Sequence, residues 1–314
     1  MKFKKIILNN YYFYTFVSSI LFICVLVILL NYFFYSSMET FTVITDNKSI
    51  HEDLDGDGER DTLYIKKDDK NYYIQINMKN GTSFGLDPNK DLPTLGDSLN
   101  HWPLRASIID VSRDNVKEIF VQSSFHGKPI QHVFTLNEKS YEDVLYTNNN
   151  ILGFVDSKNN KTPKIISANI ANNEISFNSY IFIKGVLKKF EYNYPVNYVG
   201  CDTILNFISL VQSFPNDALT LPPYLYPNIS GNDINLLYQS ANNGTVYTFQ
   251  DGSFKDLSWD SKGVPHEIKW TLNFKGTLVS DPKAVKSIIF DLILTKINNS
   301  DGTFTYKITS IDLR

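Results

Sequence analysis

The chain has 314 residues, of which 43% are hydrophobic and 20% are charged, and its formal net charge is −3. This composition excludes a disordered chain, and the near-neutral charge excludes the basic footprint of a nucleic-acid-binding protein. Cys24 lies in an apolar run and Cys201 stands alone far downstream, so we expect no intrachain disulfide. The many tyrosine and phenylalanine residues favour β-structure.

The N-terminal region predicts a membrane anchor. Three lysines within the first five residues precede residues 11–35, an aromatic and apolar run that contains no charged residue. Roughly 20 apolar residues suffice to cross a bilayer, so we expect residues 11–35 to form a transmembrane helix in contact with the lipid bilayer. The lysines predict a cytoplasmic N-terminus, which places the bulk of the chain outside the plasma membrane as a single-pass protein. A cleaved signal peptide is the alternative, but this run is long for one and no A-x-A-like site follows it.

Three segments of the middle region align on an aspartate. They read DLDGDGERDTLYIKK from Asp53, DVSRDNVKEIFVQSS from Asp110 and DSKNNKTPKIISANI from Asp156. Each has a polar loop followed by a β-rich run, and the starting points are 57 and 46 residues apart. Spacings of this size are typical of a unit of about four short strands, such as a propeller blade.

The first loop has the composition of a calcium site. Calcium prefers six to eight hard oxygen ligands, and aspartates at alternate positions of a tight loop supply them. An EF-hand loop would need a glutamate at its twelfth position and a flanking helix, but the twelfth residue is Tyr64, within a strand-like run. A plain solvated turn is the alternative to a metal site.

The pattern D-x-D-x-D-G-x-x-D followed at once by a strand resembles the calcium loop of FG-GAP or VCBS-type repeats, the units of integrin-like β-propellers. The resemblance implies one structural calcium ion at the rim of a blade, in a loop between strands. Its implied ligands are the side chains of Asp53, Asp55, Asp57 and Asp61 and the backbone carbonyl of Glu59. The source that we expect is bacterial, because a composition rich in Lys, Asn, Ile and Tyr suggests an AT-rich bacterial genome.

The other two loops depart from this pattern. The second loop is a candidate for a weak metal site, with the corresponding positions occupied by Asp110, Ser112, Asp114, Val116 and Glu118. Asn115 replaces a glycine there and Arg113 places a positive charge between the ligand positions, which favours a loop without metal. In the third loop, Lys158 and Lys164 occupy ligand positions, so we expect no metal.

The C-terminal third predicts two helices and then strands. DTILNFISLVQSF has apolar residues at helical spacing, with Asp202 as a candidate N-cap, and GNDINLLYQSA predicts a second helix capped by Asn232 or Asp233. The later runs TVYTFQ, FKDLSWD, HEIKWTLNFKG, SIIFDLILTKI and TFTYKITSIDL predict antiparallel strands. Their predicted turns are Asp251-Gly252, residues 261–263 and Asp301-Gly302.

The predicted fold class is mainly β with an α+β C-terminal part. We expect an N-terminal transmembrane helix, then β-propeller-like blade repeats, then two helices and an antiparallel sheet. The corresponding domains are residues 1–38 (cytoplasmic stub and anchor), 39–198 (three β repeat units) and 199–314 (an α+β domain, by analogy a cystatin-like cone).

The sequence shows no familiar catalytic motif, and we assign no catalytic residues. We therefore expect a non-enzymatic, membrane-anchored extracytoplasmic protein with a calcium-stabilised repeat region that binds or scaffolds at the cell envelope. Its expected partners are the lipid bilayer and an envelope protein or glycan, but no nucleic acid. The alternative is an extracytoplasmic enzyme acting on cell-envelope polymers, with an active site that no local motif reveals.

Overall fold

A computed structural model describes residues 17–18, 20–23, 25, 42–43, 49–137, 140–156, 163–195, 197–216 and 220–314. The chain divides into two units, residues 1–39 and residues 40–314. In the first unit, residues 17–18, 20–23 and 25 are helical and exposed. The predicted transmembrane segment, residues 11–35, lies mostly outside the described residues. Among those that are described, no helix is both long enough and apolar enough to cross a bilayer.

Residues 40–314 begin with three successive antiparallel meanders of four strands each, which we call units A, B and C. Unit A consists of β2 (Ser49–Glu52), β3 (Asp61–Lys67), β4 (Tyr72–Asn77) and β5 (Ser83–Gly85). Unit B consists of β6 (Arg105–Ile109), β7 (Glu118–Phe125), β8 (Lys128–Leu136) and β9 (Tyr141–Thr147), and β1 (Thr42–Val43) pairs with β6. Unit C consists of β10 (Ile151–Val155), β11 (Lys164–Ala171), β12 (Glu174–Ile183) and β13 (Val186–Phe190).

The strand pairing of the three units coincides residue for residue. Leu63 pairs with Ile76 in unit A, and the residues 57 positions later, Phe120 and Val133, pair in unit B. A further shift of 46 positions gives Ile166 and Ser179, which pair in unit C. These shifts are the ones that align the three aspartate segments in the sequence. Each loop that begins with one of these aspartates connects the first two strands of its unit.

The C-terminal part adds helices and long strands to unit C. A short 3-10 turn, η1 (Tyr198–Gly200), leads into α2 (Cys201–Gln212), and α3 (Gly231–Asn242) follows. Four strands then form an antiparallel meander: β14 (Thr245–Trp259), β15 (Pro265–Leu278), β16 (Val285–Asn298) and β17 (Phe304–Leu313). Because β14 pairs in parallel with β10, unit C and these four strands form one eight-stranded sheet.

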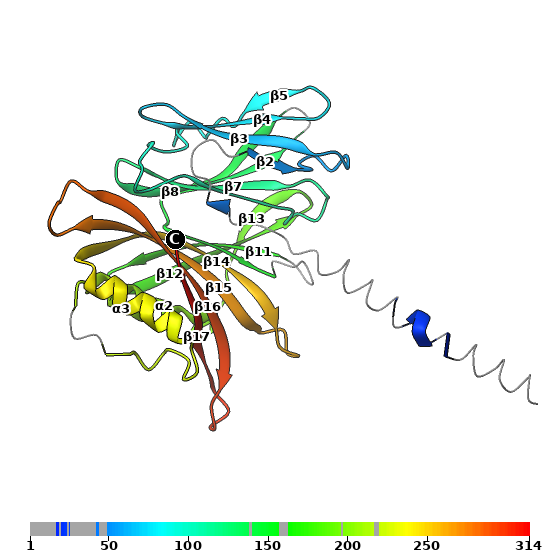
Figure 1. Cartoon of the computed structure of the whole chain (residues 1–314). Helices are drawn as coiled ribbons and strands as arrows, with labels where there is room; N and C mark the ends of the chain where they lie inside the picture. The colour runs from blue at the N-terminus through cyan, green and yellow to red at the C-terminus, as the bar shows by residue number, and fades with distance from the viewer. Residues whose placement is uncertain are drawn as a thin grey trace, which may run out of the picture. The chain divides into compact units, whose positions relative to one another are not determined.

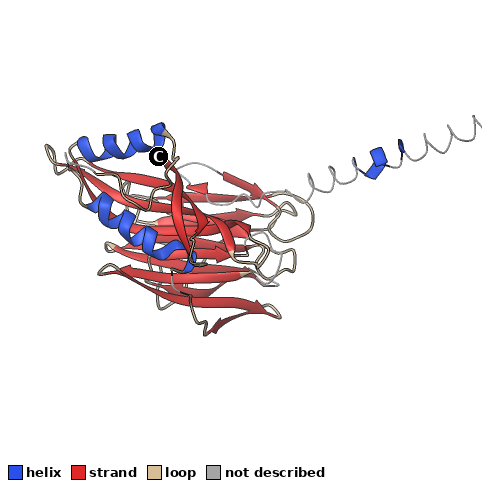
Figure 2. Ribbon diagram, turned by 90° about the horizontal axis from the view of Figure 1, so that it is seen from below, coloured by secondary structure: helices blue, strands red, loops and turns tan. Residues whose placement is uncertain are grey.

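The three sheets and the two helices stack in layers (Figure 1). Apolar residues that alternate along the strands of units A and B form one core, which includes Leu63, Ile76, Ile119 and Phe134. A larger core joins the eight-stranded sheet to α2 and α3, which lie along one face of that sheet (Figure 2). This second core includes the fully buried residues Phe207, Leu237, Phe254, Trp270 and Phe290.

Unit B meets the eight-stranded sheet through a more polar interface. Arg105 Nη2 lies 2.6 Å from Asp251 Oδ1, and Trp102 Nε1 donates to Asp251 Oδ2 at 2.8 Å. Gln122 donates to the backbone carbonyl of Gly252, while the rings of Phe120 and Phe154 make an edge-on contact at 4.8 Å.

Asp251 and Gly252 lie inside the continuous strand β14. The turn predicted at these two residues is wrong, because β14 runs through them with a bulge between Phe249 and Asp251.

The predicted fold class, with propeller-like repeats followed by a separate C-terminal sheet, is also wrong. The chain is mainly β, but the described residues form no closed propeller, and the C-terminal strands are not a sheet of their own. The units do not close into a ring: β14 joins the edge of unit C, and the helices cover one face of the eight-stranded sheet. At the other end, the outer face of unit A is polar and includes Thr62, Lys66 and Gln75. The predicted domain boundaries stay a prediction.

Candidate metal centre

The first loop, residues 53–60, connects β2 to β3 at one rim of unit A. Gly56 has φ +80° and Gly58 has φ +87°, a left-handed conformation that glycine adopts without steric cost. At Gly56 space is restricted as well, because an added Cβ would lie 2.9 Å from the backbone oxygen of Asn115 in the second loop. The two glycines thus allow a tight turn directly against the neighbouring loop.

Asp53 organises this turn through its carboxylate. Its Oδ1 accepts a hydrogen bond from the N–H of Gly56 at 2.8 Å, and its Oδ2 accepts one from the N–H of Gly58 at 3.0 Å. Backbone amides thereby fix both the side chain and the path of the loop. A fixed carboxylate loses little further freedom when it binds a cation, which favours binding.

Asp61, at the start of β3, is only 1% exposed. Its Oδ2 accepts from the N–H of Leu54 at 2.9 Å, and its Oδ1 accepts from the N–H of Lys79 at 2.9 Å. Asp61 therefore joins the beginning of the loop to the β4–β5 turn. A carboxylate oxygen that accepts one hydrogen bond keeps a second lone pair, which a cation can use.

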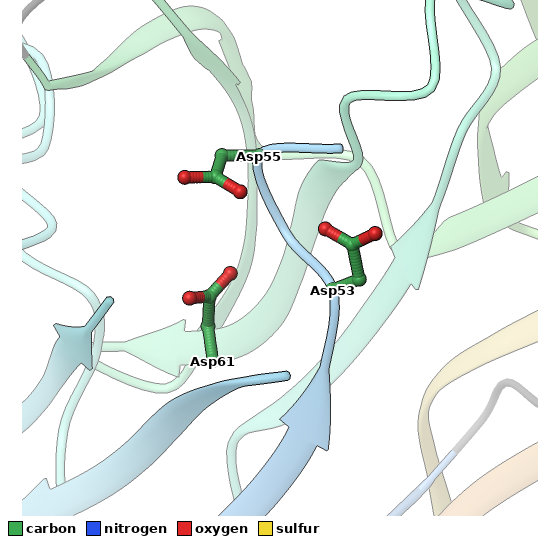
Figure 3. A group of neighbouring side chains, drawn as sticks. All are labelled: Asp53, Asp55 and Asp61. Carbon is green, nitrogen blue, oxygen red and sulfur yellow. The ribbon is translucent and has the colours of Figure 1, made fainter. Parts of the chain in front are cut away.

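Asp55 completes a cluster of three carboxylates. One oxygen each from Asp53, Asp55 and Asp61 lies within 4.8 Å of the other two, and the three side chains face a common space (Figure 3). Burial raises the pKa of Asp55, and the neighbouring carboxylates of Asp61, Asp57 and Asp53 raise it further, although the N–H of Asp57 has the opposite effect. The carboxylates therefore repel one another, and a cation among them would remove that repulsion.

The side chain of Asp57 is not among the three that converge. It is exposed, and its Oδ1 accepts a hydrogen bond from the N–H of Glu59 at 2.7 Å. The predicted contribution of Glu59 is its backbone carbonyl, and this stays a prediction. The three converging carboxylates still fit a hard cation, because Ca²⁺ and Mg²⁺ both select oxygen donors and take waters for the remaining positions.

The second loop repeats the hydrogen bonds of the first. Asp110 accepts from the N–H groups of Arg113 at 2.7 Å and Asn115 at 3.2 Å, as Asp53 does from Gly56 and Gly58. Arg113 and Asn115 also adopt positive φ values of 68° and 70°. Asp114 accepts from the N–H of Val116, in the same way that Asp57 accepts from Glu59. The two loops thus share one backbone conformation in spite of their different sequences.

The second loop differs in its carboxylates. Among the residues that the structure describes, Asp110, Asp114 and Glu118 are not brought together as the first three are. Ser112 is half-buried in this loop. Burial raises the pKa of Glu118 to about 7, and Asp110 and Asp114 raise it as well, against the hydrogen bonds from Val111 and Ser112. A weak metal site in this loop stays a prediction.

The third loop begins differently. Asp156 has φ +64°, and its N–H donates to Asp256 Oδ2 at 2.6 Å. Arg113 of the second loop lies 3.8 Å from the Asp156 carboxylate. Lys164 begins β11, whereas Lys158, the other predicted obstacle to a metal, lies outside the described residues. The described part of this loop brings no group of carboxylates together.

The three loops lie side by side along one rim. The N–H of Lys117 donates to the carbonyl of Leu54 at 3.0 Å, and the Tyr141 hydroxyl donates to the carbonyl of Lys117 at 3.1 Å. Lys117 Nζ also lies 2.7 Å from the Glu52 carboxylate. Such contacts between units depend on the fold, and the spacing of the aspartates gives no indication of them.

No protein-family model matches this chain, and no curated protein was found to be similar to it. The resemblance to FG-GAP or VCBS-type repeats therefore stays a prediction. The case for a metal centre at the first loop depends on its geometry, which brings together Asp53, Asp55 and Asp61.

Proposed function

We propose that this chain is a non-enzymatic binding or scaffolding protein of the cell envelope, whose stacked β units are stabilised by one calcium ion in the first loop. The observation that supports the proposal most directly is the convergence of Asp53, Asp55 and Asp61 on one space. In this proposal these three side chains hold the ion. Asp57 and the backbone of Glu59 approach it directly or through water.

The proposed ion has a structural role. Asp53 follows β2 and Asp61 begins β3, so an ion bound to both would connect two strands of unit A. The loop between them contacts the second loop through Leu54 and Gly56. Neutralising the three carboxylates would therefore stabilise the rim where unit A packs against unit B.

The proposed location is outside the plasma membrane. It follows from the charge and hydropathy of the N-terminal sequence. Extracellular modules bind calcium with dissociation constants of about 10⁻⁴ to 10⁻³ M, which is adequate for a structural site where the calcium concentration is high. Protease added to intact cells checks this location, since we expect it to digest the region from residue 49 onward. Protection of that region until the cells are lysed would contradict it.

Calcium titration of the full chain, by calorimetry and thermal unfolding, tests the metal centre. We expect one calcium ion to bind, and at a hundredfold excess over Kd it should add about 2.7 kcal/mol to the free energy of unfolding. Asp53→Asn and Asp55→Asn should each weaken binding at least tenfold, because each removes a charged ligand.

Asp110→Asn is the matched control. It changes the same hydrogen-bonding position in the second loop, and it should leave calcium binding nearly unchanged. Equal losses in Asp53→Asn and Asp110→Asn would assign the effect to the turn rather than to a ligand. An absence of calcium binding by the wild type would show that the aspartates form a solvated turn.

A further inference from the structure

A pocket of about 150 Å³ opens at one end of the eight-stranded sheet. It is lined by η1, by the segment that precedes η1 and by the ends of four strands. The strand residues in the lining include Val155, Lys164, Pro265 and Phe304. Sites for drug-sized ligands are usually about 300–1,000 Å³. The smaller volume here is suited to a single ring or a single side chain.

Aromatic rings form much of the pocket wall. The rings of Tyr192 and Tyr198 have centroids 5.9 Å apart, and those of Phe304 and Tyr306 have centroids 5.8 Å apart. Phe177 supports Tyr198 from behind in an edge-on contact at 5.5 Å. Rings packed in this way offer rigid apolar faces at little cost in conformational entropy.

The backbone of η1 is held in an unfavourable conformation beside this pocket. Asn197 and Val199 have φ values of 56° and 50°, and a left-handed conformation is unusual for a β-branched residue. The carbonyl of Val199 accepts a hydrogen bond from Trp270 Nε1 at 3.0 Å, so a fully buried core residue fixes the turn. The fold thereby holds Asn197 and Tyr198 at the pocket wall.

Two polar groups at the pocket have no polar partner among the described residues. Lys164 Nζ lies 4.7 Å from the centre of the Tyr192 ring, and no described carboxylate pairs with it. Lys296, by contrast, lies over Phe304 and is paired with Asp260 at 2.7 Å. The Tyr198 hydroxyl likewise has no hydrogen-bond partner in the described part of the chain. Burial raises the pKa of Tyr198, so this hydroxyl keeps its proton and can donate it.

We propose that this pocket binds one sugar ring that carries a carboxylate, as in the uronic acid unit of an acidic glycan. The C–H face of the ring packs on the aromatic wall, and the carboxylate pairs with Lys164. The sugar hydroxyls exchange hydrogen bonds with Tyr198 and Asn197. This inference rests on the proposed binding role and names the ligand class, but it shares no residue with the metal centre.

The test is a titration of the full chain with D-glucuronate, D-glucose and benzoate, followed by ligand-observed NMR. We expect D-glucuronate to bind at least tenfold more tightly than D-glucose, which lacks the charge, and than benzoate, which lacks the hydroxyls. Lys164→Gln should weaken D-glucuronate binding at least tenfold and Tyr198→Phe severalfold. The matched control is Lys188→Gln, a change of an exposed lysine on β13, and it should have no effect.

Several results would overturn the proposal. They are an absence of D-glucuronate binding, equal binding to the wild type and Lys164→Gln, and equal binding of D-glucose and D-glucuronate. Preferential binding of benzoate would replace the sugar with an aromatic acid. Asp55→Asn should bind D-glucuronate normally in the presence of EDTA, so failure of the calcium site and failure of the pocket give different results. Unchanged melting temperatures of the pocket variants confirm that they fold.

Discussion

Asp61 and Glu118 occupy the same position in two successive loops and differ by one methylene group. The Asp61 carboxylate accepts one hydrogen bond from its own loop, at Leu54, and one from the β4–β5 turn, at Lys79. In Glu118, Oε2 accepts hydrogen bonds from two adjacent amides, those of Val111 and Ser112. The longer side chain thus stays within its own loop, and its carboxylate is buried near Asp110 and Asp114.

Glu118 makes stability depend on pH. Its pKa is raised from 4.5 to about 7 in the folded protein, so the protonated carboxyl favours folding, and this contribution is lost as pH rises from about 4.5 to about 7. In calcium-free buffer we expect Glu118→Gln to raise the free energy of unfolding at pH 8, by about 3 kcal/mol at most. At pH 4 the variant and the wild type should be equally stable.

Urea unfolding of the full chain at pH 4, 6 and 8 measures this difference. Glu142→Gln is the control, because Glu142 is exposed on β9 and its replacement should leave the pH profile unchanged. Parallel profiles for the wild type and Glu118→Gln would contradict the prediction.

The sequence and the structure agree on which loop brings carboxylates together, whereas the metal and its ligand set stay predictions. The spacing of the aspartates identified the loop, because the pattern is local. The predicted ligand set also includes Asp57, whose side chain accepts a hydrogen bond from the backbone of Glu59. The amide of Lys79 that anchors Asp61 comes from a different turn, and no local pattern could have indicated it.

At the scale of elements, the sequence predicts an element correctly where its formation depends on residues that are close together in the sequence. Both C-terminal helices form where the apolar periodicity predicts them, but their caps differ from the expected residues. The second is capped by Ser230, whose hydroxyl oxygen accepts from the N–H of Asp233. The first follows Gly200 in a left-handed conformation, because the chain enters it from η1. The prediction of a turn at Asp251-Gly252 is wrong, because these two residues contact Arg105 and Gln122 inside the fold. Those partners are distant in the sequence, so no local pattern indicates them.

Gly153, in the middle of β10, provides a test of packing within the eight-stranded sheet. It pairs with Phe254 of β14, and a Cβ at this position would overlap the Phe254 ring. That ring is buried in the core, where its centroid lies 4.6 Å from that of Trp270 in a tilted contact. We expect Gly153→Ala to lower the free energy of unfolding by about 1–3 kcal/mol, as measured by urea unfolding.

Gly231→Ala is the matched control. Gly231 is the first residue of α3, and an added Cβ there has no neighbour within 4 Å. Alanine has the higher helix propensity, so this change should leave stability unchanged or raise it slightly. A Gly153→Ala variant as stable as Gly231→Ala would show that the sheet adjusts to the extra methyl group.

At the scale of the whole molecule, one ion pair connects the repeat units to the C-terminal strands. Arg105 and Asp251 are 3% and 1% exposed, and Trp102 also donates to Asp251. Removing one member of a buried pair leaves the other charge without compensation, which costs about 3–5 kcal/mol. We therefore expect Asp251→Asn to lower the free energy of unfolding by this amount, as measured by urea unfolding.

Two further variants complete this test. Glu52→Gln removes a more exposed pair, with Lys117, and should cost less than about 1 kcal/mol. The double variant with Arg105→Met should recover part of the loss, because it no longer contains an unpaired buried charge. If Asp251→Asn were no more harmful than Glu52→Gln, the ion pair would not be what connects the units.

The layered arrangement could not be predicted from local patterns, although the repeat spacing could. The spacing indicates blade-like units, but three such units do not determine whether the sheets close into a ring. The parallel pairing of β10 with β14 connects strands that are far apart in the sequence, so neither strand gives a local signal of it. Exposed and buried residues alternate along β3 and β4, but alternation in a single strand does not indicate whether another sheet covers its outer face.

That outer face limits how this molecule can change in length. In unit B, the positions that correspond to Thr62 and Tyr64 are Ile119 and Val121, both fully buried against unit A. A gene duplication that copied unit A once more would press the apolar face of the new copy against the polar face of the old one. The stack therefore cannot grow at this end by copying alone. A lengthened descendant would first need apolar substitutions on an exposed surface, which would lower its solubility until the added unit covered them.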